Sequence, residues 1–265
     1  MSDEDISIDE KRVYADKTDV TDLYVATGLG LALVSVSADL VGEFSLSHRC
    51  RATDVATDAD RLAVATDEDV LVADRTDRQF RATEFGPASA VALTDGEFLA
   101  GDGDGRVARY DDGAWTTLGT VGSVRAIDGD LLATADGVVR IDGEDLLHVG
   151  LDDVRDVAAD GTPLAATGDG LYALGPGWTR VIEGEFAVVA RDGERAHAAT
   201  TDALYELDGE WHKRTTPLDE PIAALGHGPG IYAMTEGGTV LVDVGDGWRD
   251  RVLGLREVAG VALAP

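Results

Sequence analysis

The chain contains very little cysteine or lysine and no asparagine. Cys50 is the single cysteine among 265 residues, so no internal disulfide can form, and this usage is typical of a protein from a reducing cytoplasm. Cys50 has no partner motif beside it, so we interpret it as structural rather than catalytic. Lysine occurs only at Lys11, Lys17 and Lys213, so arginine supplies nearly all of the positive charge.

Long apolar runs are also absent. No run approaches the roughly 18 residues that a membrane-spanning helix needs, and the N-terminus lacks the basic and apolar regions of a signal peptide. We therefore expect a cytoplasmic protein with no membrane partner. Met1 to Glu10 is expected to form an acidic, mobile tail ahead of a single domain over residues 11–265.

Recognisable catalytic motifs are missing as well. The chain has no G-x-S-x-G elbow, no Walker loop, no H-E-x-x-H and no paired C-x-x-C. The G-D-G-D-G stretch from Gly101 to Gly105 lacks the closing bidentate carboxylate of a calcium loop, so we interpret it as a hairpin turn. The histidines are scattered without metal-ligand spacing, at His48, His148, His197, His212 and His227. The sequence thus predicts no catalytic residue, no metal and no cofactor.

The chain does contain one sequence motif that is repeated seven times. Each copy has a short apolar run that usually ends in threonine, then a tight acidic or glycine turn, and then a second apolar run. Its clearest form is L-A-A-T-G-D-G-L-Y-A-L, from Leu164 to Leu174. The threonine or its equivalent recurs at Thr27, Thr66, Gly101, Thr134, Thr167, Thr200 and Thr235, which are 39, 35, 33, 33, 33 and 35 residues apart. Such a period indicates a repeat architecture, although it does not by itself indicate a function.

Each repeat is predicted to be a meander of four antiparallel strands. Within each repeat, apolar residues recur about every second position, as in a β-strand. Asp-Gly or Gly-Gly pairs separate these stretches, which is typical of two-residue hairpins. In the fifth copy the expected strands are Val154 to Ala158, Pro163 to Thr167, Leu171 to Leu174 and Trp178 to Ile182. Radial repetition protects the edges of such sheets, so we predict an all-β, seven-bladed β-propeller. A β-solenoid is the main alternative, but its rungs run in parallel without two-residue hairpins.

The ends of the chain offer two candidates for closing the ring. Val258 to Leu263 repeats the first-strand pattern without a second strand after it, so it is predicted to complete the first blade. Arg12 to Ala15 competes for the same place, although its charged flanks suit a buried inner strand less well.

An aromatic column is expected at the start of the fourth strands. Trp115, Trp178, Trp211 and Trp248 each follow a glycine-containing turn, and Phe44 and Phe80 hold the same column in other blades. A repeated aromatic at one structural position favours a packing role over the stacking of a sugar or base.

The formal net charge is −29, and it is spread through every blade. Dense carboxylates hold water and ions, and at 1 M salt a screening length of roughly 3 Å removes most of their mutual repulsion. We therefore interpret the composition as that of a protein from a salt-loaded cytoplasm. No basic stripe is visible, which argues against nucleic-acid binding.

Arginines interrupt the first strands of two adjacent repeats. Arg125 and Arg155 occupy a column that holds small or polar residues elsewhere, and Asp156 follows directly. Side chains at the start of an inner strand can reach the mouth of a central channel, so Arg125, Arg155 and Asp156 are candidates for binding an anion, with Arg256 contributing from the preceding turn. The competing interpretation is an internal ion pair with Asp54 or Asp156.

The motif T-G-D-G-L-Y-A-L, from Thr167 to Leu174, resembles repeats of the sensor propellers that precede two-component regulators, but their tryptophan and glycine-threonine elements are incomplete here. The Trp-Asp dipeptide and the sialidase box S-x-D-x-G-x-T-W are missing. With I-S-I-D-E-K-R-V-Y-A-D-K-T from Ile6 and L-A-V-A-T-D-E-D-V-L-V from Leu62, nearly the whole chain resembles an uncharacterised family of haloarchaeal β-propeller proteins. That resemblance implies a fold and a source, but no activity and no catalytic residue.

Two functions of different classes follow. The first is a monomeric, non-catalytic interaction or scaffold propeller whose protein partner is unidentified. It would dock on the connections between blades, Ser45 to Arg51, Glu84 to Ser89, Thr216 to Pro221 and Leu253 to Glu257, and on the turns that share their face. The alternative is a small-anion sensor or lyase-like enzyme with its site at the channel mouth. A metal-dependent hydrolase is a third hypothesis and would need carboxylates that converge on the axis.

Overall fold

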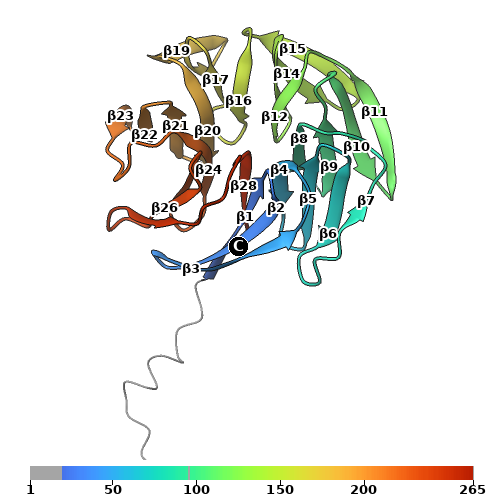
Figure 1. Cartoon of the computed structure of the whole chain (residues 1–265). Coiled ribbons are helices and arrows are strands. Elements are labelled where there is room, and N and C mark those ends of the chain that lie inside the picture. The colour runs from blue at the N-terminus through green and yellow to red at the C-terminus, as the bar shows by residue number, and fades with distance from the viewer. Residues whose placement is uncertain (1–19, 95, 265) are drawn as a thin grey trace, which may run out of the picture.

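The computed structural model describes residues 20–94 and 96–264 of the chain. These residues form seven four-stranded antiparallel sheets. Figure 1 shows the sheets arranged around a central axis. The predicted all-β, seven-bladed propeller is thereby confirmed. The expected N-terminal tail, Met1 to Glu10, lies outside the described residues.

We number the blades in the order of the chain and give their strands from the axis outward. Blade 1 contains β28 (Gly260–Ala264), β1 (Val20–Thr27), β2 (Gly30–Ser37) and β3 (Leu40–His48). Blade 2 contains β4 (Ala52–Thr57), β5 (Arg61–Thr66), β6 (Val70–Asp74) and β7 (Arg81–Ala82). Blade 3 contains β8 (Ala90–Thr94), β9 (Glu97–Gly101), β10 (Arg106–Asp111) and β11 (Ala114–Thr120).

The remaining four blades follow the same order. Blade 4 contains β12 (Val124–Asp128), β13 (Leu131–Thr134), β14 (Gly137–Asp142) and β15 (Asp145–Gly150). Blade 5 contains β16 (Val154–Ala158), β17 (Leu164–Thr167), β18 (Gly170–Leu174) and β19 (Trp178–Glu183). Blade 6 contains β20 (Phe186–Asp192), β21 (Arg195–Thr200), β22 (Ala203–Asp208) and β23 (Glu210–Arg214). Blade 7 contains β24 (Ile222–His227), β25 (Ile231–Thr235), β26 (Thr239–Asp243) and β27 (Arg249–Val252).

The C-terminal strand closes the ring. β28 pairs with β1 in antiparallel register, from Ala264 opposite Asp22 to Gly260 opposite Ala26. The innermost strand of blade 1 therefore comes from the end of the chain and its three outer strands from the beginning, as predicted. The competing segment, Arg12 to Ala15, lies outside the described residues.

The hydrophobic core is divided among the seven junctions between blades. At the junction of blades 1 and 7, Leu23 and Val25 pack with Tyr232 and Met234, and a comparable cluster fills each of the other six junctions. Each sheet is therefore apolar on both faces near the axis, which explains why the inner strands are rich in alanine, valine and leucine.

The repeated threonine has a local structural cause. The hydroxyls of Thr27, Thr66, Thr134 and Thr167 each donate to the carbonyl oxygen three residues later, over 2.7, 2.6, 2.7 and 2.9 Å. This bond closes the turn from the second to the third strand while the side chain stays buried. In blade 3 the position is Gly101, where an added Cβ would lie 2.6 Å from Cγ1 of Val124, so glycine is required.

The tryptophan column packs between blades as expected. Trp115, Trp178, Trp211 and Trp248 are all partly buried against the junction clusters, and Phe80 packs in the same way. Phe44 is an exception, because 44% of its surface is exposed on the outermost strand of blade 1. The packing role expected for Phe44 is therefore wrong.

The two faces of the ring differ in their loops. The four-stranded meander places the connections between blades and the second-to-third-strand turns on one face, which we call the connection face. The hairpins from first to second and from third to fourth strands lie on the opposite face. Since each first strand begins at the connection face, residues at those starts surround one mouth of the channel.

Candidate functional site

The innermost strands enclose a central channel of about 640 Å³. All of the strands that line it are the first strands of their blades, so every blade contributes to one continuous wall. Arg125, Arg155 and Asp156 are among the lining residues.

A recurring irregularity determines which side chains reach the connection-face mouth. In five first strands the register with the second strand shifts just after the first residue. A β-bulge of this kind inserts one unpaired residue and re-aims its side chain. The residues at these positions are Thr53, Arg125, Arg155, Ala187 and Ala223, and all of them line the channel. Arg125 and Arg155 therefore both occupy the bulged position of their first strands.

Arg125 and Arg155 have different partners. The Arg125 guanidinium forms an ion pair with the Asp153 carboxylate, at 2.7 Å, and donates to the carbonyl of Val154 over 3.1 Å. For Arg155 the closest acceptor is the carbonyl of Phe186, at 3.4 Å, and no carboxylate of the described residues forms an ion pair with it. The expected internal ion pair with Asp54 or Asp156 is therefore wrong, because Arg125 pairs with Asp153 of the neighbouring connection instead.

Asp156 lies one residue deeper and joins two blades. Its carboxylate accepts the backbone amide of Val157 over 2.9 Å and that of Val189, in the next blade, over 2.8 Å. Asp54 repeats the arrangement between blades 2 and 3 with the amides of Val55 and Val91, over 2.8 and 2.9 Å. These bonds hold adjacent first strands together, so Asp156 is committed to the wall rather than to Arg155.

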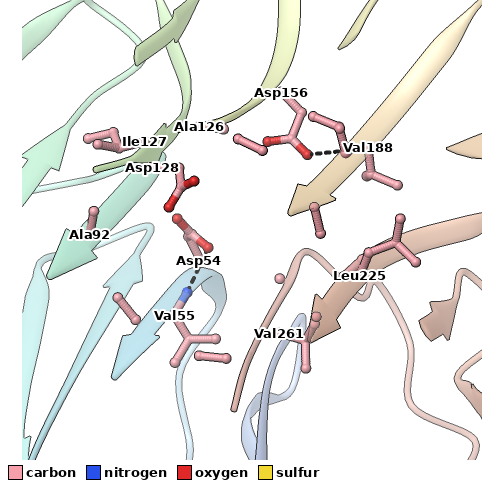
Figure 2. A pocket seen from close by; sticks show the side chains of 18 of the residues that line it. Asp54, Val55, Ala92, Ala126, Ile127, Asp128, Asp156, Val188, Leu225 and Val261 are labelled. Atoms are coloured by element: carbon pink, nitrogen blue, oxygen red, sulfur yellow. Dashed lines mark hydrogen bonds between the residues drawn. The ribbon is translucent and has the colours of Figure 1, made fainter. Parts of the chain in front are cut away.

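The protonation of these carboxyls follows from their surroundings. Removal from bulk water raises the pKa of both Asp54 and Asp156 to about 7, and the amide hydrogen bonds only partly oppose that rise. Asp128 also lines the channel and accepts the amide of Ala159 over 2.7 Å, and burial raises its pKa as well. Figure 2 shows the three aspartates among the residues that line the channel, with the Asp156 carboxyl directed to the neighbouring strand.

Arg256 does not join this group. It lies in the connection from β27 to β28, where its carbonyl accepts the amide of Gly28 over 3.1 Å, and it is exposed and absent from the channel wall. Of the four candidate site residues, the fold therefore brings Arg125, Arg155 and Asp156 together and leaves Arg256 apart.

The connections around this mouth are held by specific bonds. Glu84, Leu151, Asp153 and Glu257 all adopt left-handed backbone, with φ of 65°, 62°, 51° and 53°. Non-glycine residues rarely adopt this conformation unless their surroundings enforce it. Here Asp153 pairs with Arg125, and Glu257 pairs with Arg51 over 2.8 Å. In the β7–β8 connection the Asp69 carboxylate accepts the amides of Glu84, Phe85 and Gly86 over 2.9, 2.8 and 3.1 Å.

A buried polar cluster around His197 and His227 was not predicted from the sequence. Nδ1 of His197 lies 2.9 Å from Nε2 of His227, across the junction of blades 6 and 7. Nε2 of His197 faces Glu206 at 3.6 Å, and Glu206 bonds Arg214, which also pairs with Asp243. Burial is the main cause that lowers the pKa of His197 to about 3 and that of His227 to about 4. The two histidines are 30 residues apart in the sequence. Predicting that they meet would have required assigning them to strands of adjacent repeats and knowing which faces of those strands pack together.

Two further structural searches bear on the site. Within residues 20–94 and 96–264, no three His, Cys, Asp or Glu side chains are grouped as ligands for a metal ion. The same part of the chain contains no helix with the length and apolarity needed to cross a bilayer.

The ring of meanders and its lined channel define the chain as a β-propeller protein. Residues 7–264 match the profile of the β-propeller family that is described as HVO_0234-like. The chain belongs to that family. A search of curated protein sequences returns no match.

Solved structures share the fold at low sequence identity. The WD40 propeller domain of Doa1 superposes with a TM-score of 0.65 at 15% identity, covering 79% of this chain and 84% of that one. YCF48 bound to a D1 peptide gives a TM-score of 0.63 at 13% identity, covering 90% and 87%. A chain of the nidogen–laminin complex gives 0.60 at 11% identity, covering 92% and 98%. At these identities the similarity extends to the fold alone.

Proposed function

We propose that this propeller is a non-catalytic protein-interaction module that works in a salt-rich cytoplasm and docks its partner on the connection face. The observation that carries the proposal is the set of connections held in left-handed backbone by Arg125–Asp153, Arg51–Glu257 and the Asp69 carboxylate. A surface held in place before binding loses less conformational entropy when a partner docks. Propellers commonly mediate protein interactions, and two of the similar structures contain a bound peptide or partner protein.

Matched charge reversals test which face binds. Glu68 and Asp152 are exposed on the connection face, and Glu144 and Glu194 are exposed in hairpins of the opposite face. We expect E68R/D152R to lose a partner that is captured stoichiometrically in molar KCl, and E144R/E194R to retain it. Both pairs change the net charge equally, so loss confined to the second pair would contradict the proposal.

A second candidate function is recognition of a small anion at the channel mouth, either as a sensor or in a lyase-like reaction. The observation that favours it is Arg155, which lines the channel and forms no ion pair among the described residues. Arg125 and Asp156 would flank the ligand, although Arg125 shares its charge with Asp153.

The anion hypothesis has its own control within the channel. Arg191 lines the opposite mouth, so R191M removes one channel arginine without changing the candidate site. We expect R155M, but not R191M, to abolish co-purification of an anionic metabolite detected by small-molecule mass spectrometry. Equal retention in both variants, or no bound metabolite in the unmodified protein, would exclude this function.

A further inference from the structure

The outer strand of blade 1 exposes several large apolar side chains. Leu40, Phe44 and Leu46 of β3 are 67%, 44% and 41% exposed, and Val252 of the adjacent β27 is 70% exposed. β3 is the last strand of its sheet. A long, apolar, unpaired edge is a template for another strand, so proteins normally cover it.

Part of this edge is already occupied. Arg251 of β27 donates to the carbonyl of Val41, over 2.8 Å, and to that of Gly42. Within the described part of the chain, nothing pairs with the backbone from Glu43 to Leu46 on its outer side. The open stretch therefore coincides with two of the exposed apolar side chains.

The described chain begins at the end of blade 1 where β3 also begins. The first described residue, Val20, pairs with Ser37, and Ser37 pairs with Leu40, so these three residues line up at one end of blade 1. A further strand beyond β3 would lie about three strand spacings, roughly 14 Å, from β1. The five residue steps between Ala15 and Val20 can span up to about 17 Å. A segment whose C-terminal end lies at the start of β3 would run antiparallel to β3.

From these observations we propose that the N-terminal segment Ile6 to Ala15 docks along the outer edge of β3 and covers Phe44 and Leu46. If Tyr14 lies opposite Leu40, Lys11 comes beside Glu43, and Ile8 comes beside Leu46. The segment thus offers a cation to the exposed carboxylate and an apolar side chain to the exposed leucine. The family match begins at residue 7, so all of the segment after Ile6 lies within the matched range.

Hydrogen exchange of the full chain tests this docking. We expect the amides of Ile6 to Ala15 to exchange at least about tenfold more slowly than an unstructured peptide, since docked backbone is protected. F44D/L46D on β3 is expected to remove this protection. T179D/V181D places the same substitutions on the exposed outer strand β19 of blade 5 and is expected to leave it unchanged.

A second variant keeps the test independent of the folding of β3. I8D/V13D changes only the segment, and we expect it to speed exchange of Glu43 to Leu46 while the inner strands keep their protection. Unprotected segment amides in the unmodified protein, or the same protection in both β3 and β19 variants, would overturn the proposal. Protection that appears only with a concentration-dependent dimer would assign the edge to a second copy and would overturn it too.

Discussion

At the scale of single residues, a few buried polar side chains form the same stabilising hydrogen bonds in several blades. Buried threonines close the turns of the connection face, and Asp54 and Asp156 join neighbouring first strands through pairs of amide hydrogen bonds. The threonines could be predicted, because their spacing carries the repeat. The partner of Arg125 could not, because a bulge adds a residue that the sequence does not mark and turns the guanidinium toward Asp153.

The threonine bond is expected to contribute measurably to stability. Thr134→Val keeps the shape of the buried side chain but leaves the carbonyl of Gly137 without its 2.7 Å hydrogen bond. Loss of one such bond costs about 1 kcal/mol of unfolding free energy. We expect chemical denaturation to show this loss for T134V and almost no change for T116V, whose threonine is exposed on β11.

Asp156 is expected to make stability fall as pH rises. Its pKa is raised from 3.8 to about 7 in the folded protein, so between these values the folded state binds more protons than the unfolded state. The unfolding free energy of the unmodified protein, measured relative to that of D156N, should therefore decrease from pH 4 to pH 7. D145N, on the exposed strand β15, provides the control, and a constant difference for D156N would contradict the assignment.

At the scale of elements, stability depends on contacts between blades. The strands of each meander and the closure by β28 followed from hydrophobic period and Asp-Gly turns, which act within one repeat. The pairing of His197 with His227 did not follow, because it joins a second strand to a first strand of the next blade. Contacts of that kind depend on how sheets face one another rather than on local spacing.

The histidine pair is expected to give the opposite pH dependence to Asp156. The pKa values of His197 and His227 are lowered from 6.5 to about 3 and about 4, so below pH 6.5 the unfolded state takes up protons that the folded state does not. Stability from this junction is complete above pH 6.5 and declines toward pH 4. Asp192, Arg195, Glu206 and Arg214 are the charged groups around the pair.

Replacement of one histidine isolates this contribution. H197Q removes a titrating group from the junction, so its unfolding free energy relative to the unmodified protein should rise as pH falls from 6.5 to 4. H212Q, on the exposed outer strand β23, should show no such trend when both are measured by denaturant titration.

At the scale of the whole molecule, charge sets the conditions under which the ring is stable. A net charge of −29 on 265 residues gives strong mutual repulsion. That repulsion is screened over roughly 3 Å at 1 M salt but over roughly 30 Å at 0.01 M. We expect the melting temperature to fall by several degrees when KCl is lowered from molar to tens of millimolar. A flat melting temperature over that range would contradict the proposed salt-rich setting.

The most direct test of the central proposal is affinity purification of the tagged full chain in molar KCl from the cells that produce it, with protein and small-molecule mass spectrometry of the same eluate. The account predicts a protein partner in stoichiometric amount, lost in E68R/D152R and kept in E144R/E194R. A pure chain that carries a stoichiometric anionic metabolite and no protein partner would contradict it and would assign the function to Arg125 and Arg155 at the channel mouth.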